Sequence, residues 1–215
     1  MKIGVLGTGM VGNAIGTKLV QLGHAVKMGA RSATNEKAAA WVQANGAGAS
    51  QGTFAETAAF GEIVFNCTSG AASLEVLRQA GADNLKGKVL IDIANPLDFS
   101  HGMPPSLSVC NTDSLGEQIQ RAFPEVRVVK SLNTVNCNLM VNAALLPGEH
   151  IMFVSGNDAD AKAQVTSILK DWFGWQAVID LGDITTARAT EMMLPVWISL
   201  MMKLGTPLFN FAIVR

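Results

Sequence analysis

The sequence predicts an α/β fold: a doubly wound, mostly parallel sheet with a short helical appendage at its C-terminal end. Three observations support this prediction. Short β-rich runs alternate with helical stretches, which is typical of a parallel sheet wrapped by helices. A glycine-rich turn at residues 7–12 joins the first predicted strand to the first predicted helix. After Gly182 the alternation stops and a helical pattern takes over.

The strand predictions rest on short apolar runs bounded by turn residues. No period repeats along the chain, so each run is treated as a separate strand. We expect strands at Lys2–Gly7, Ala25–Gly29, Ala49–Gln51, Glu62–Cys67, Lys88–Ile93, Arg127–Leu132, Ile151–Ser155 and Ala177–Asp180.

The helix predictions rest on apolar residues at helical spacing between these strands. Thr53 and Glu56 form a capping-box pattern that opens a short helix before Gly61. A long helix is expected from Ile184 to the sequence Gly205-Thr206-Pro207. The chain therefore divides into a nucleotide-binding unit, 1–182, and an appendage, 183–215, which belongs to the same domain or serves dimerisation. The remaining helices are expected at Met10–Leu22, Asn35–Asn45, Ala71–Ala80, Ser114–Ala122 and Ala159–Trp172.

Composition excludes several classes of protein. The 215 residues are 49% hydrophobic and only 15% charged, which excludes a disordered chain. With 16 basic and 17 acidic residues, the net charge is close to zero and does not favour binding to nucleic acid or to an anionic membrane. Three cysteines without a CxxC pair argue against a disulfide framework or zinc ribbon. The apolar stretch Met192–Met202 is too short to span a bilayer, so a cytoplasmic protein is expected.

The glycine-rich turn predicts a dinucleotide site. The first glycine permits a tight turn, the second lets a pyrophosphate approach the backbone, and the third lets the helix pack on the strand. The amides of the helix N-terminus then bind phosphate. The motif alone is weak, but here a strand precedes it, and a helix and a second strand follow. The residues expected at the pyrophosphate are Gly7, Thr8, Gly9, Met10, Val11 and Gly12.

The end of the second strand favours NADP(H) over NAD(H). An NAD site usually has Asp or Glu about 20 residues after the glycines, whereas this chain has Arg31 and Ser32 there and no acid until Glu36. An arginine fork suits a 2′-phosphate in charge and geometry, and the serine adds a hydroxyl donor. The alternative is a solvated loop arginine.

Three further strand ends should line the ligand crevice, because open α/β sheets bind ligands outside the carboxyl ends of their strands. Small polar residues after the fourth strand leave room for the cofactor, although a small core residue is the preferred interpretation of Cys67. Asn95 offers an amide to the cofactor or substrate, or forms an ordinary turn before Pro96. The expected cofactor residues here are Cys67, Thr68, Ser69, Asn95 and Pro96, and the expected substrate residues are Asn133 and Thr134.

The chain shows no convincing general base and no metal-binding cluster. Lys130 and His101 are the candidates for proton transfer, but a rim lysine and a solvated loop histidine are the preferred interpretations. Oxidising an alcohol needs a positioned base. Hydride exchange between two redox heterocycles needs mainly alignment, because the cofactors carry the chemistry. The crevice therefore favours hydride transfer to a flavin-like acceptor.

The sequence resembles the NADP oxidoreductases that depend on the deazaflavin coenzyme F420, and, more distantly, the oxidoreductase domain of the STEAP metalloreductases. The resemblance implies a homodimer that moves hydride between NADP(H) and a deazaflavin or flavin. It assigns the pyrophosphate to residues 7–11, the 2′-phosphate to Arg31 and Ser32, and the nicotinamide and acceptor to the strand ends at 95–96 and 133–134. Its segments are GTGMVGNAIGTKLVQLGHAVKMGARS, DIANPL, VVKSLNTV, VSGNDADAKAQV and ITTARATEMMLPVWISL.

The apolar segment Glu191–Phe211 is expected to form the dimer interface and to border the acceptor ring through Met193 and Trp197, since an apolar helix must be covered. Core packing of a buried helix is the alternative, and it is the preferred interpretation of the methionines on this helix. Two other functions stay open. One is a small NADP-dependent dehydrogenase or imine reductase of the hydroxyacid type, and the other is an NADP-binding module without turnover.

Overall fold

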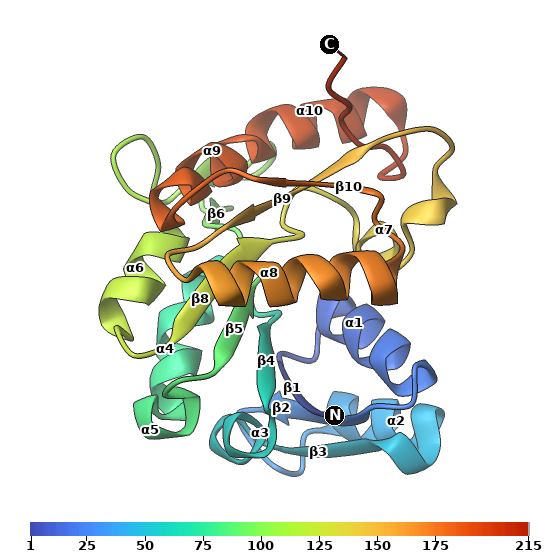
Figure 1. Cartoon of the computed structure of the whole chain (residues 1–215), viewed down its shortest axis with the longest axis vertical. Helices are drawn as coiled ribbons and strands as arrows, with labels where there is room; N and C mark the ends of the chain where they lie inside the picture. Colours follow the sequence, from blue (N-terminus) through green and yellow to red (C-terminus); the bar gives the residue numbers. More distant parts are fainter. Residues whose placement is uncertain (215) are drawn as a thin grey trace.

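Eight strands form one sheet across the part of the chain that the structure describes, in the order β10-β9-β8-β5-β4-β1-β2-β3 (Figure 1). The structure is a computed structural model and describes residues 1–214. The neighbouring strands β3, β2, β1, β4, β5 and β8 are all parallel. Strand β9 is antiparallel to β8, and β10 is parallel to β9. The strands are β1 (Lys2–Leu6), β2 (Ala25–Ala30), β3 (Ala49–Thr53), β4 (Ile63–Asn66), β5 (Val89–Asp92), β8 (Arg127–Ser131), β9 (Ile151–Ser155) and β10 (Ala177–Asp180).

Helices cover both faces of this sheet, which confirms the predicted doubly wound α/β class. One core cluster joins residues of α1, α2, α7 and α8, and the other joins residues of α3, α4, α5, α6 and α9. Each predicted strand lies within two residues of an observed one. The helices are α1 (Met10–Gln21), α2 (Glu36–Asn45), α3 (Phe54–Phe60), α4 (Gly70–Ala80), α5 (Ala82–Leu85), α6 (Leu115–Ala122), α7 (Cys137–Met140), α8 (Ala159–Ser167), α9 (Ala187–Met192) and α10 (Leu194–Leu204).

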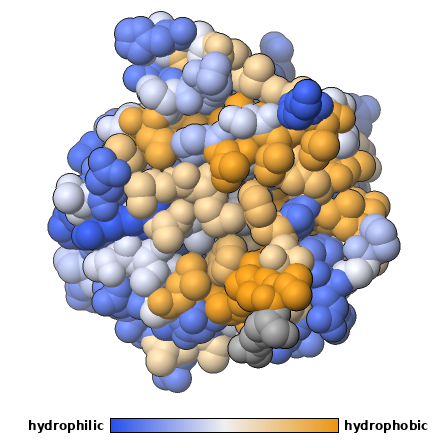
Figure 2. Space-filling model, turned by 90° about the horizontal axis from the view of Figure 1, so that it is seen from above, coloured by the Kyte–Doolittle hydropathy of each residue, from blue (hydrophilic) through white to orange (hydrophobic). Residues whose placement is uncertain are grey.

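The C-terminal segment differs from the single long helix that the sequence predicts. A 3-10 turn (Ile184–Thr186) precedes α9, and Met193 separates α9 from α10. The break has a local cause, since Pro195 has no N–H to donate to the carbonyl of Glu191. Of α10, only Leu194 and Ile198 are buried, so the core-packing alternative is wrong for most of this helix. Figure 2 shows hydrophobic side chains gathered on the face seen from above, where α10 and the C-terminal end lie in Figure 1.

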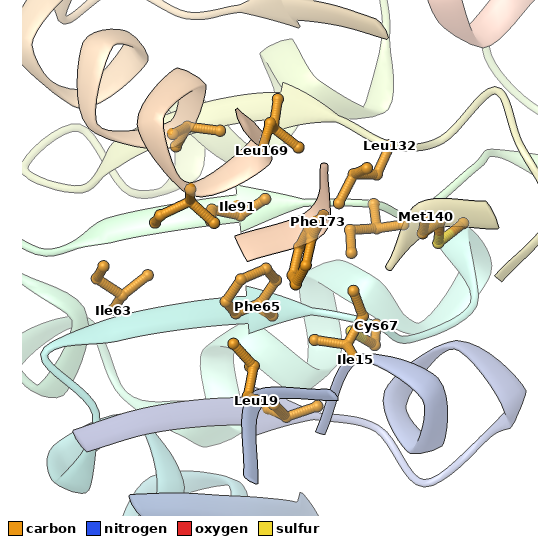
Figure 3. Close-up of a cluster of buried hydrophobic side chains, with 14 of the residues drawn as sticks. Ile15, Leu19, Ile63, Phe65, Cys67, Ile91, Leu132, Met140, Leu169 and Phe173 are labelled. Atoms are coloured by element: carbon orange, nitrogen blue, oxygen red, sulfur yellow. The ribbon is translucent and has the colours of Figure 1, made fainter. Parts of the chain in front are cut away.

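The core alternates between the two faces of the strands. In β4, Ile63 and Phe65 point to one cluster and Val64 points to the other, as the period-2 geometry of a strand requires. Figure 3 shows the first cluster, in which Ile15 from α1 and Phe173 after α8 approach the strand side chains. Both faces of the central strands are therefore fully covered, and their free ends form the ligand-binding edge.

The sequence prediction missed the short helices α5 and α7 and two further features. Strands β6 (Leu97–Asp98) and β7 (Ser106–Leu107) form a two-residue antiparallel pair in the loop after β5. The predicted helix Ala159–Trp172 is present, but its last turns, Ile168–Trp172, have π geometry. Within residues 1–214, no helix has the length and hydrophobicity needed to cross a membrane.

Candidate functional site

The glycine turn is a tight fit between β1, α1 and the end of β4. Gly7 has a φ of 114°, a conformation that favours glycine, and a Cβ there would lie 2.8 Å from the carbonyl oxygen of Cys67. A Cβ on Gly12 would lie 2.0 Å from the carbonyl oxygen of Gly7. A Cβ on Gly9 would meet nothing within 4 Å, so this glycine faces open space. Each glycine thus has the role that dinucleotide binding requires.

The N-terminus of α1 is open to an anion. Its N-cap Gly9 makes no side-chain capping bond, and its first turn carries no acidic residue. The first amides of a helix have no intrahelical partner, so here they remain available for phosphate oxygens. The residues at the turn therefore fit a pyrophosphate. A groove of about 1480 Å³ starts at Thr8 and Gly9 and runs along α1, and it is lined also by residues of α2 and of the segment 136–145 around α7. Lys18 and Lys37 are in its lining.

A second cavity, the strand-end pocket, lies at the carboxyl ends of β4 and β5, beside the glycine turn. Its volume is about 580 Å³, within the range of small-molecule sites. Most of its lining is apolar, and Leu194 and Trp197 of α10 supply one wall. The lining residues are Met10, Val11, Cys67, Thr68, Ser69, Gly70, Ala71, Ile93, Ala94, Asn95, Leu97, Asp98, Phe99, Asn133, Val135, Asn136, Cys137, Met140, Leu194 and Trp197.

Two of the polar residues of this pocket, Asn95 and Asn133, are hydrogen-bonded to each other. Asn133 donates from Nδ2 to Oδ1 of Asn95 at 2.9 Å, and Asn95 donates back to the backbone oxygen of Asn133 at 2.9 Å. Asn133 also donates to the carbonyl oxygen of Thr190 in α9 at 3.1 Å. Leu132 before it has a φ of 64°, an uncommon conformation for leucine that turns the chain out of β8. The ends of β5 and β8 and helix α9 are thus held together at the pocket.

Arg31 and Ser32 follow β2 on the other side of the glycine turn. Both are exposed, and Ser32 Oγ lies 2.9 Å from Thr34 Oγ1. They lie outside the strand-end pocket and the α1 groove. In a dinucleotide fold, the end of β2 is where the adenosine ribose binds. An exposed guanidinium at this position suits a 2′-phosphate that arrives with the cofactor.

Lys130 is not at the rim, and that interpretation is wrong. It is 1% exposed, and its ammonium lies 2.7 Å from Asp92 Oδ2 and 2.8 Å from Glu191 Oε1. Burial alone lowers the pKa of Lys130, but the two carboxylates outweigh it and the pKa is raised. Lys130 does not line the pocket and keeps its proton, so its position does not suit a proton donor.

The remaining titratable candidates are poorly suited to acid–base chemistry. His101 is exposed in the loop after β6 and does not line the pocket. Cys67 is buried, as the preferred interpretation held, and burial with the nearby Asp92 carboxylate raises the pKa of its thiol. Asp98 lines the pocket, but a hydrogen bond from the Ser100 amide lowers its pKa. Among residues 1–214, no group of acidic, histidine and cysteine side chains could hold a metal ion.

The strand-end pocket brings together eight of the nineteen residues that the sequence singled out. Met10, Val11, Cys67, Thr68, Ser69, Asn95, Asn133 and Trp197 line it, whereas Pro96, Thr134 and Met193 lie outside its lining. Sequence reasoning missed Asn136, Cys137, Met140 and Leu194. Asn136 carried a signal, since an asparagine before a short helix is a common N-cap, and its side chain does cap α7.

Fold and site together define a dinucleotide-binding oxidoreductase of the Rossmann class. The family model described as "NADP oxidoreductase coenzyme F420-dependent" matches residues 2–96. A crystal structure of a candidate F420-dependent NADP reductase from Arthrobacter sp. FB24 is 54% identical, covers 100% of both chains and superposes with a TM-score of 0.94. The chain belongs to this family, and it is an NADP-dependent oxidoreductase.

Two more distant similarities agree with this assignment. Metalloreductase STEAP3 of Rattus norvegicus is 28% identical over 206 residues, which are 91% of this chain and 38% of that protein. The chain thus spans well under half of that relative. The NADPH complex of a reductive aminase from Aspergillus terreus has a TM-score of 0.67 at 19% identity, over 95% of this chain and 62% of that one. At this identity the similarity concerns the fold alone.

Proposed function

We propose that this protein transfers a hydride between NADP(H) and a flavin or deazaflavin ring, with coenzyme F420 as the first candidate acceptor. The observation that carries the proposal is the strand-end pocket, because it joins the nicotinamide side of the glycine turn to an apolar wall large enough for a second ring. A planar heterocycle suits a lining of this kind, with aromatic and aliphatic side chains and a few polar groups.

The side chains of the pocket match the needs of hydride transfer. The bound cofactors supply the redox chemistry, and the protein aligns them and excludes water. Asn95 keeps a second Nδ2–H for a ring carbonyl, and Asn133, whose two Nδ2–H groups are already donated, keeps its Oδ1 as an acceptor for a carboxamide. Leu194 and Trp197 cover the ring opposite the glycine turn. Ring reduction takes up one hydride and one proton, and solvent at the pocket mouth can supply the proton.

The alternatives have less support from the site. A dehydrogenase or imine reductase of the hydroxyacid type needs an acid close to its substrate, yet Lys130 is buried in ion pairs and His101 lies outside the pocket. A binding module without turnover would need no apolar space beside the nicotinamide, whereas about 580 Å³ is available.

The test is anaerobic oxidation of NADPH by the purified protein with F420, FMN, FAD, ferric chelates or a cyclic imine as acceptor. We expect turnover with F420 or a flavin. As a matched pair, Trp197→Ala should raise the KM for the acceptor, and Arg121→Gln, on the exposed face of α6, should leave it unchanged. Turnover with the imine alone would favour the alternative enzyme class, and no turnover with any acceptor would favour the binding module.

We propose further that two copies of the chain associate through the C-terminal segment and that the protein works in the cytoplasm. The support is the exposed apolar side chains of Met192, Val196, Met202, Leu204 and Leu208 (Figure 2), since patches of this kind mark interfaces. All three cysteines are unpaired thiols, which suits a reducing compartment. Light scattering at micromolar concentration should give the mass of a dimer, and Val196→Glu should give a monomer.

A further inference from the structure

A buried ion cluster lies directly behind the strand-end pocket and outside its lining. Lys130, Asp92 and Glu191 are each at most 1% exposed. The Lys130 ammonium donates to Asp92 at 2.7 Å, pairs with Glu191 at 2.8 Å and also donates to the backbone oxygen of Ala94. All three of its N–H donors are therefore used. Burying such a cluster costs solvation free energy, so a gain in stability alone does not explain why these charges lie here.

Each of the three partners of Lys130 is connected to a different wall of the pocket. Ala94 lines the pocket itself, after β5. Asp92 accepts from Asn66 Nδ2 at 2.8 Å, and Asn66 Oδ1 accepts from the hydroxyl of Thr68, which lines the pocket after β4. Glu191 is in α9, three residues before Leu194 of the opposite wall. The Lys130 ammonium is thus connected to three parts of the pocket lining, at Ala94, at Thr68 and at Leu194.

Glu191 is one buried polar anchor of the C-terminal segment, beside the Arg188–Glu117 pair and the hydrogen bond from Asn133 to the carbonyl oxygen of Thr190. Its two carboxylate oxygens accept from the amides of Leu115 and Gly116, the first residues of α6, at 2.8 and 3.0 Å. These amides have no helical partner, so a carboxylate is favoured there. Within one chain only Leu194 and Ile198 of α10 are buried, so few apolar contacts inside the chain hold this helix. Glu191 therefore helps to place Leu194 and Trp197, and Trp197 also stacks on Phe209 with the ring centroids 5.3 Å apart.

We propose that Lys130 and Glu191 are positioning residues that hold the C-terminal wall of the pocket at the distance a second ring requires. The proposal rests on the proposed function, because it assigns that wall to the acceptor. Neither residue touches a ligand. Their partners fix where Thr68, Ala94 and Leu194 stand, and a misplacement of about 1 Å can cost up to about a hundredfold in rate. The phosphate-binding turn is not part of this cluster.

The mild test variant is Glu191→Gln. The amide keeps the size of the side chain but offers one acceptor oxygen to three donors, so the wall loosens while Lys130 keeps its amine. We expect the KM for the acceptor to rise by roughly tenfold or more, and the Kd for NADPH to change by less than about twofold because the glycine turn is untouched. Lys130→Met is the harsher variant, since it leaves two buried carboxylates without their cation.

Hydrogen exchange supplies a readout that does not need turnover. In Glu191→Gln, amides of α9 and α10 should exchange faster, while those of α1 and β1 stay unchanged. Arg121→Gln is the matched control, because it breaks the pair between Arg121, on the exposed face of α6, and Asp113 just before this helix, and should alter neither readout. A uniform rise in exchange would indicate general destabilisation and overturn the proposal.

Two kinetic results would also overturn it. One is an unchanged acceptor KM in Glu191→Gln together with lost turnover in Lys130→Met, which would make Lys130 a proton donor. The other is a Kd for NADPH that rises as much as the acceptor KM. If the unaltered protein reduces none of the acceptors, the proposed function fails. Faster exchange confined to α9 and α10 in Glu191→Gln would still show that Glu191 holds the C-terminal wall in place.

Discussion

Replacing Gly12 with alanine should damage both folding and cofactor binding. The new Cβ would lie 2.0 Å from the carbonyl oxygen of Gly7, where at least 3.0 Å is needed, so the turn must open by about 1.0 Å. Gly7 cannot retreat easily, because it already abuts the backbone of Cys67. Overpacking of this kind costs up to about 3 kcal/mol. In a chain of this length, that loss lowers the Tm by roughly 6–12 °C.

The matched variant is Gly9→Ala, whose Cβ would enter open space. Its Tm should stay unchanged, but the methyl group occupies the approach to the helix amides, where the pyrophosphate must come close. We expect NADPH to bind at least tenfold more weakly to both variants, or about 1.4 kcal/mol.

Calorimetric titration with NADPH and thermal unfolding by circular dichroism separate the two effects. The reasoning is refuted if Gly12→Ala unfolds at the temperature of the unaltered protein, or if Gly9→Ala binds NADPH with unchanged affinity.

Three further outcomes are expected. Arg31→Ala should lose about 1.5–3 kcal/mol of NADPH binding, the scale of a hydrogen bond to a charged group, while NADH binding barely changes; equal losses for both cofactors would contradict the 2′-phosphate role. The pKa of Glu117 is lowered by its hydrogen bond with Arg188, so its contribution to stability is complete above its ordinary value of 4.5 and is lost as the pH falls. Glu117→Gln should therefore destabilise the fold in urea at pH 7 and far less at pH 3. Finally, iodoacetamide followed by mass spectrometry should modify the exposed Cys110 and spare the buried Cys67, whose pKa is raised.

The local features of the fold were predictable from the sequence because their causes are local. The glycine turn follows from backbone sterics within six residues, and the capping box at Thr53 and Glu56 is present with both of its hydrogen bonds. The break before α10 could also have been predicted from the sequence, because Pro195 has no N–H to continue the hydrogen bonds of the preceding helix.

The burial of Lys130 depends on partners that are distant in the chain. Asp92 is its register neighbour on the adjacent strand, and Glu191 comes from the C-terminal segment. A signal existed, because an aspartate and a lysine each end a strongly apolar strand, and opposite charges in such runs tend to pair. Sequence reasoning placed both strands but did not pair them, and so assigned the lysine to the rim. Pairing strands across dozens of residues is a tertiary property.

The position of β9 and β10 in the sheet affects which residues of the pocket can be exchanged during evolution. Because β9 and β10 are added beyond β8, the chain leaves the sheet at the edge strand β10, and α9 and α10 run back to the pocket at β4 and β5 (Figure 1). The wall that Leu194 and Trp197 supply is thus built from a late part of the chain, after the glycine turn and β2. Residues of this wall can be exchanged without altering the half that holds the dinucleotide. Chimaeras spliced near residue 183 that keep Glu191, and with it the ion pair to Lys130, should therefore retain NADPH binding while the pocket wall changes.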